Sequence, residues 1–389
     1  MADTFYFSRD TKVHITPNNS SGTATSDVYY IPVLDGFSFS QATNVSEITL
    51  NEMASSSGVS RRTRQMFTDS YAPAEWSFST YIRPFASSGG TRGTSGKSTD
   101  NDGEHHVVEE VLWNALVAAD NPTGANDGWT YDGTTKATLA ATNSNKVALN
   151  TFTMEVEMGS GKSGAVVYQL DKCVVNEVSI DFDIDGIATA NWSGFASLVT
   201  EKLDGGTMST ATIYEGTNAN DTNNFIRNRL TDLTVTAADT TTFPGASSNG
   251  VYNLTLTGGN VTISNNMTYL TPETLGIINQ PLGHVTGTRS ISGNFTCYLN
   301  GDTGSSMDLF EDLIEATTKI TNSFDLAFGV GGGSNIPRMV INVDQAHFEV
   351  PTHSIDDIVS IETNFHGLPS SIDGTDEFTI DFVGPDVTV

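Results

Sequence analysis

Cysteine is scarce in this sequence, whose 389 residues include only Cys173 and Cys297. Small domains that depend on disulfide bonds carry several cysteines at regular spacings. The sequence therefore argues against a disulfide framework. We expect both residues to be free thiols that pack in the core as small apolar side chains.

Basic residues are also few, with 18 Lys and Arg against 46 Asp and Glu and a formal net charge of -28. Tight binding to nucleic acid or to an anionic membrane surface needs a concentration of Lys and Arg, so both functions are disfavoured. Charged residues make up only 16% of the chain. Ser, Thr, Asn and Gly must supply the remaining polar surface, which is typical of turn-rich β structure.

Long apolar runs are missing as well. No stretch approaches the roughly 20 apolar residues that a membrane-spanning helix needs. The first residues, 1–4, include neither a basic segment nor the start of an apolar one, so we expect no signal peptide and no membrane insertion.

What the sequence does contain is a long pattern that occurs twice. An alternating apolar strand runs into a glycine turn, a β-rich stretch follows, and the pattern closes on an aromatic residue with a glycine two residues later. The two occurrences span residues 149–199 and 322–368. One such match could arise by chance, so the flanking sequence decides its meaning.

The flanking segments match in the same order. Alternating strands at 5–17 and 28–40 have counterparts at 229–236 and 251–264, and period-two alternation predicts antiparallel sheets with one buried face. Ser77-Phe78-Ser79-Thr80-Tyr81-Ile82 aligns without gaps with Asn294-Phe295-Thr296-Cys297-Tyr298-Leu299. A period of roughly 170 to 220 residues indicates a duplicated domain, because solenoid repeats are far shorter.

One helix is predicted in each copy. In the first copy Val111, Leu112 and Leu116 lie at helical spacing. In the second copy Phe310, Leu313 and Ile314 form the apolar stripe. We therefore predict a mainly β chain of two tandem β-sandwich or half-barrel domains, each with one packed α-helix. The predicted units are residues 1–205, a linker at 206–224, and residues 225–389.

Two long polar segments, 41–74 and 265–290, are predicted to be loops. The first contains Arg61, Arg62 and Arg64, and the second contains Arg289. Loops of this length in compact domains are usually functional or become ordered against a partner, although a disordered surface loop is the alternative. Inserts at about 87–102 and 121–145 occur only in the first copy and are predicted to be surface excursions.

No motif predicts catalysis or a cofactor. Gly159-Ser160-Gly161-Lys162-Ser163 lacks the earlier glycine of a phosphate loop and is better explained as a hairpin turn. The segment that opens at Asp181 resembles a calcium loop but has Trp192 where the last ligand should be Glu. The histidines and cysteines have no zinc-ligand spacing. We predict no enzyme, no cofactor and no metal site.

The whole pattern resembles the tail tube (major tail) proteins of tailed bacteriophages. The resemblance rests on the strand order, the long loop before the Phe78-to-Tyr81 strand, the single helix, the glycine hairpin, and the closing Asn364-Phe365-His366-Gly367. It covers about 5–199 and 225–384. Two domains in one chain resemble the minority of tubes that are built from fused double-domain subunits.

The resemblance implies a virion protein of the phage tail, assembled in the host cytoplasm. Three chains would form a pseudo-hexameric ring, strands of all domains would join into one β-barrel, and stacked rings would form the conduit for DNA ejection. It also implies a tape measure protein inside the tube, with terminator and baseplate or tip proteins at its ends. A negative lumen would let double-stranded DNA pass without sticking.

The resemblance also assigns roles to particular residues. The two long loops would reach the neighbouring ring or subunit, which makes Arg61, Arg62, Arg64 and Arg289 the contact candidates. Glu155 and Glu157 are the candidates for lining the lumen.

The alternative is a tandem β-sandwich adhesin, or another virion structural module such as a decoration or neck protein. An adhesin would be expected to cluster aromatic residues on its binding loops. The four tryptophans are instead spread along the chain, at Trp76, Trp113, Trp129 and Trp192. The sequence therefore favours the tube subunit.

Overall fold

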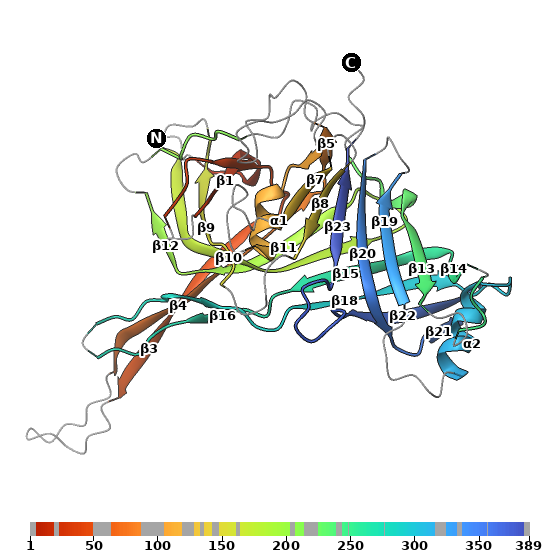
Figure 1. Ribbon diagram of the computed structural model, residues 1–389. Helices are drawn as coiled ribbons and strands as arrows, with labels where there is room; N and C mark the ends of the chain where they lie inside the picture. The colour runs from red at the N-terminus through yellow and green to blue at the C-terminus, as the bar shows by residue number, and fades with distance from the viewer. Residues whose placement is uncertain are drawn as a thin grey trace, which may run out of the picture.

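A computed structural model of the chain describes residues 5–18, 23–49, 64–86, 105–118, 128–132, 136–141, 148–160, 164–202, 207–213, 225–238, 243–247, 249–275, 277–315, 324–332, 337–355 and 357–384. Within these ranges the protein is mainly antiparallel β-sheet with two α-helices (Figure 1). The predicted fold class is confirmed.

One large sheet, which we call the shared sheet, takes strands from both halves of the chain (Figure 1). In order across the sheet its strands are β3 (Ser38–Thr49), β4 (Arg64–Tyr81), β11 (Thr189–Ala196), β10 (Val166–Phe182), β15 (Leu256–Ser264), β18 (Ser290–Tyr298), β22 (Val359–Gly367) and β21 (Thr352–Ile355). The two halves meet where β10 pairs with β15.

Each half also has a flanking sheet that packs on the shared sheet. In the first half its order is β2 (Tyr29–Ile31), β1 (Thr11–Pro17), β9 (Phe152–Met158), the start of β10, and β12 (Leu198–Glu201). In the second half the order is β14 (Val251–Asn253), β13 (Asp232–Ala237), β19 (Phe324–Gly331), β20 (Arg338–Phe348) and β23 (Thr379–Val383). The two halves thus have the same strand order in these two sheets.

Both halves contribute to one continuous core. Phe182 of the first half stacks on Phe328 of the second, with ring centroids 5.5 Å apart. Trp113 lies between Trp192 and Phe382, at 4.8 and 5.6 Å. Apolar side chains therefore bind the halves together, in addition to the backbone pairing of the shared sheet. Cys173 and Cys297 are free and buried, as expected.

The two helices differ in their surroundings. Every residue of α1 (Glu110–Val117) is buried, because this helix lies between the two halves. In α2 (Ser306–Glu315) the buried residues are Ser306, Leu309 and Asp312. The predicted stripe is therefore only partly correct for α2. Leu313 packs against the core, but Ile314 is 50% exposed, whereas Asp312 faces inward and accepts hydrogen bonds from Tyr252 and Gly245.

Both segments predicted as loops contain strands among their described residues. Residues 64–74 form the start of β4 and pair with β3, so that the hairpin projects from the body of the molecule (Figure 1). The second segment contains a small hairpin of β16 (Thr268–Leu270) and β17 (Gly283–Val285). The prediction of a structureless loop is wrong for the described part of the first segment, because strands that are exposed on both faces show no apolar alternation. Most described residues of the second segment lie outside strands, as predicted.

The insert at 121–145 is not a separate surface excursion. It contributes β7 (Trp129–Asp132) and β8 (Lys136–Ala140), and β8 pairs with β23 of the other half. Ala137 and Leu139 are buried in that contact. A second short hairpin joins β5 (Pro84–Ala86) to β6 (His105–Val107), while the other predicted insert, 87–102, lies outside the described residues.

Candidate functional surface

The shared sheet has one apolar and one polar face. Its apolar residues, such as Trp76, Val178 and Phe295, are buried. The opposite face, which we call the polar face, follows the alternation of the same strands. It carries Ser38, Ser40, Glu75, Ser77, Ser79, Glu177, Ser179, Asp181, Asn191, Ser193, Asn260, Thr262, Ser292, Asn294, Glu362, Asn364 and His366.

The polar face is acidic. Glu75, Glu177, Asp181 and Glu362 lie on it, and none of its residues named above is Lys or Arg. The register places Glu177 opposite Ser193 and Ser264, and Asp181 opposite Asn260. Glu177 and Asp181 therefore have small, neutral polar neighbours across the strands, whereas Glu75 lies opposite Ser40 and Phe195.

Side-chain hydrogen bonds connect the strands across this face. Ser79 donates to Asn191 Oδ1 at 2.6 Å, and Asn191 Nδ2 donates to Asp181 Oδ2 at 3.2 Å. In the second half Asn294 Nδ2 donates to Glu362 Oε1 at 3.0 Å. Amide donors thus hold the carboxylates in place without bringing a positive charge.

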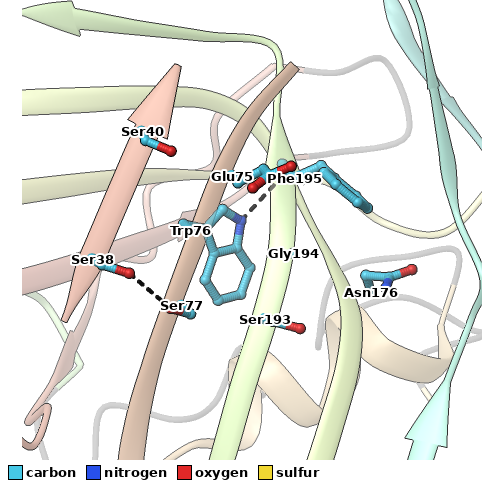
Figure 2. Close-up of a pocket in the computed structure, with 9 residues that line it drawn as sticks. All are labelled: Ser38, Ser40, Glu75, Trp76, Ser77, Asn176, Ser193, Gly194 and Phe195. Atoms are coloured by element: carbon cyan, nitrogen blue, oxygen red, sulfur yellow. Dashed lines mark hydrogen bonds between the residues drawn. The ribbon is translucent and has the colours of Figure 1, made fainter. Parts of the chain in front are cut away.

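A shallow hollow lies on the polar face of the first half (Figure 2). Ser38, Glu75, Ser77 and Ser193 are among the residues that line it. At its floor Trp76 Nε1 donates to the carbonyl of Phe195 at 3.2 Å. The hollow has hydroxyls and one carboxylate but no group that predicts catalysis.

The two glycines that close the repeated sequence pattern have a packing role. A Cβ on Gly194 would lie 2.0 Å from the carbonyl oxygen of Val174 and 2.5 Å from the Trp76 ring. A Cβ on Gly367 would lie 2.9 Å from Val343. Only glycine lets these strands approach their neighbours so closely. The two glycines are not at equivalent positions, because Trp192 lies opposite Phe78, whereas the residue opposite Phe295 is Thr363 and not Phe365.

The two glutamates predicted to line a lumen lie on β9, in a flanking sheet, and not on the polar face. Glu155 is buried and bonds Lys202 Nζ at 2.5 Å and the backbone amide of Ser209 at 2.6 Å. Burial alone would raise its pKa, but the hydrogen bonds from Lys202 and Ser209 outweigh it and lower the pKa. Glu157 is half-buried.

The predicted arginines are in different settings. Arg64 is exposed on the projecting hairpin, 3.7 Å from Glu47. Arg289 is nearly buried and pairs with Glu377 of its own chain at 3.0 Å. Arg61 and Arg62 lie outside the described residues.

The segment around Arg289 is bound within its own chain. Asn265 Nδ2 donates to the carbonyl of Leu116 at 2.9 Å, and the Tyr269 hydroxyl donates to the carbonyl of Lys172 at 2.7 Å. Asn279 exchanges backbone bonds with the β3–β4 hairpin. Residues 265–290 therefore fasten the second half to the first.

Other candidate sites receive little support. Gly159 has a φ of +77° at the turn between β9 and β10, which agrees with the predicted hairpin, although residues 161–163 lie outside the described ranges. Across the described part of the chain no group of His, Cys, Asp and Glu could hold a metal ion. Among the helices that the structure describes, none is long and apolar enough to cross a membrane.

A comparison with known proteins places the chain in a family. It is 30% identical to the tail tube protein pb6 of Escherichia phage T5, over an alignment of 392 positions that covers 96% of this chain and 75% of that protein. This chain is a phage tail tube protein. The resemblance inferred from the sequence is thus confirmed, and the tail tube protein is a component of the virion tail. No family model matches the chain.

The Glu155 site makes a prediction about stability. A carboxyl whose folded pKa is lowered adds stability above its unfolded pKa, here near 4.5, and loses it as the pH falls through the folded pKa. Lys202→Met should cost about 1–2 kcal/mol at pH 7, a value reduced because Lys202 is partly exposed. The difference from the unchanged protein should shrink below pH 4.5, as measured by urea unfolding.

Lys12→Met is the matched control, because Lys12 is exposed on the neighbouring strand β1, opposite Glu157. It should change the free energy of unfolding by less than about 0.5 kcal/mol. Equal stability of Lys202→Met and the unchanged protein at pH 7 would contradict the role given to the pair.

Proposed function

We propose that this tail tube protein assembles into rings in which the shared sheets of several chains join edge to edge into one closed barrel. Three chains would form a pseudo-hexameric ring, and stacked rings would form the conduit through which DNA is ejected. In this proposal residues 1–205 and 225–389 are two tube domains with a linker at 206–224, although β7 and β8 cross from the first to the sheet of the second.

The pairing of β10 with β15 is the observation that supports this proposal. It runs from Glu177 opposite Ser264 to Phe182 opposite Gly259. It joins two halves of equal strand order, so the same join can be repeated between chains. Among the described residues no strand pairs with the outer edge of β3 or of β21, and such edges favour pairing with another chain.

Closing the sheet into a barrel would put the polar face inside. A barrel pooled from several domains leaves an open lumen, because barrel diameter grows with the number of strands. A lumen with carboxylates and without Lys or Arg repels phosphate, in contrast to the basic grooves that hold DNA. We therefore assign the lumen to the polar face and no longer to Glu155 and Glu157.

The projecting β3–β4 hairpin is the proposed contact between stacked rings. Val45, Ile48, Met66 and Phe67 are each about half exposed on it, and exposed apolar side chains indicate a binding surface. Arg64, with Arg61 and Arg62 beside it in the sequence, would meet acidic residues of the next ring. Arg289 is left out because Glu377 already binds it.

The remaining partners follow from the proposed tube. A tape measure protein would occupy the lumen during assembly, and terminator and baseplate or tip proteins would bind the two ends. We propose a structural and not an enzymatic role. The adhesin alternative gains no support from the relative found.

Negative-stain microscopy of the purified chain tests the proposal. Rings or tubes with a central hole, and a mass of three chains for the smallest ring by sedimentation, are expected. Single chains that stay dispersed at high protein concentration would contradict it.

If the β3–β4 hairpin joins stacked rings, a change in the hairpin should impair the stacking of rings but not the formation of single rings. Changing Arg61, Arg62 and Arg64 together to Glu should leave rings intact and shorten or abolish tubes, because the hairpin tip would then repel an acidic neighbour. The measurement is the length distribution of particles in the same micrographs. Tubes of unchanged length would exclude this role of the arginines.

The lumen assignment predicts an effect on DNA. Glu177→Lys with Glu362→Lys puts one lysine on the polar face of each half, so assembled tubes should bind short duplex DNA at low salt and protect it from nuclease. Binding should weaken steeply as salt is raised. The unchanged tubes should do neither.

The control for this experiment is Glu201→Lys with Glu311→Lys. This variant also replaces one Glu by Lys in each half, so it changes the net charge equally. The two positions are exposed, on β12 and α2, and lie away from the polar face. Control tubes should give no nuclease protection. Equal protection by both variants would show that the polar face does not line the lumen.

A further inference from the structure

The junction between the two halves includes a contact beside the shared sheet. The turn that follows β10, residues 183–188, lies over the segment 225–228 that leads into the second half. Ala188 N donates to the carbonyl of Ile226 at 2.9 Å, and Asn228 N donates to the carbonyl of Gly186 at 3.2 Å. Ile187 and Arg227 form an antiparallel β-bridge between these bonds.

This contact buries apolar side chains of both halves. Ile226 is completely buried and Phe182, the last residue of β10, is 4% exposed. A small hollow of about 90 Å³ lies beside this contact and is lined in part by Phe182, Ile184 and Asn228. An exposed ion pair, Arg229 with Asp185 at 3.7 Å, lies at its rim.

The first half begins with a segment that is built like residues 225–228. Phe7 precedes the 3-10 turn η1 (Ser8–Asp10) and strand β1, just as Arg227 precedes η3 (Asn228–Leu230) and strand β13. A Cβ on Gly159 would meet the ring of Tyr6, and a Cβ on Gly331 would meet Ile226. Residues 5–8 are therefore the counterparts of 225–228.

In the first half this construction is uncovered. Tyr6 is 45% and Phe7 is 51% exposed, whereas Ile226 is fully buried. They border a hollow of about 270 Å³, three times the size of the other, whose lining includes Phe7, Val33, Phe37 and Met158. We call this space the N-terminal hollow.

The turn that would fill it is found at the far end of the shared sheet. Ser360 lies opposite Tyr298 and Thr189 lies opposite Tyr81, the two tyrosines that the sequence alignment equates. Ile358, two residues before Ser360, is thus the counterpart of Ile187.

Apolar side chains at both ends of this turn face solvent. Ile355, the last residue of β21, is 81% exposed, and Ile358 is 60% exposed. The turn also carries exposed Asp357, as the turn after β10 carries Asp185.

We propose that the N-terminal hollow receives the β21–β22 turn of a second copy of this chain. Ile355 and Ile358 would lie against Phe7, Val33 and Met158, and Asp357 would lie near the exposed Arg9. The occupant is another copy because the counterpart turn, residues 183–188, already covers the counterpart site, residues 225–228, within the chain. This inference rests on the ring proposed above and specifies a contact within one ring.

A cysteine pair tests the contact directly. In the full-length protein Phe7→Cys with Ile358→Cys should form disulfides between chains under mild oxidation, because a β-bridge places Cα atoms within disulfide range. A closed ring of three chains limits the products to two and three linked chains on a denaturing gel. The native cysteines are buried and should not take part.

The matched control is Ile187→Cys with Arg227→Cys, the counterpart pair within one chain. It should form a disulfide without linking chains. Micrographs of the same samples report on the ring itself. Absence of rings would contradict the proposed function, whereas rings without a Phe7–Ile358 link, or links that extend beyond three chains, would overturn this contact alone.

A single substitution provides an independent readout. Ile355→Asp would place a carboxylate in the apolar hollow and should weaken ring formation at least tenfold by sedimentation. Ile372→Asp is the control, because Ile372 is 95% exposed and lies outside both turns. Rings of unchanged stability in Ile355→Asp would overturn the proposal.

Discussion

The pairing of β10 with β15 is the constraint on which the rest of this structure depends. It makes one sheet out of two halves that could each have formed a separate sandwich. A strand edge that is left unpaired tends to bind another edge, and this chain satisfies one such edge internally. Among the described strands, the two outer edges of the shared sheet, at β3 and β21, lie at its opposite ends and would pair with each other in the proposed ring.

The junction within the chain has contacts for which the described part of the second half has no counterpart. Strand β8 extends the flanking sheet of the second half, and α1 is buried on all sides between the halves. The second half has no described counterpart of β7 and β8, and α2 exposes Met307 and Ile314. A ring built from such chains would alternate strong and weak junctions, so it would assemble and break at the weak ones.

Much of this fold could be predicted from the sequence, because half-buried strands alternate visibly. The repeated order, the glycine turns and the buried thiols all followed from local patterns. Contacts between distant segments could not be predicted. Glu155 looked like a surface charge, since Lys202 and Ser209 are 47 and 54 residues away. The β3–β4 hairpin looked like a loop because it has no buried face.

The polar face offers a physical reason for the scarcity of basic residues in this chain. A carboxylate on this face is stabilised by a hydrogen-bond donor beside it. Lysine would supply that donor but would also place a cation where DNA is proposed to pass. Asparagine supplies it without charge, as Asn191 does for Asp181 and Asn294 for Glu362. At the edge of the sheet, hydrogen bonds from Asn364 and then His366 lower the pKa of Glu349. The strands of this face are therefore connected by neutral side chains.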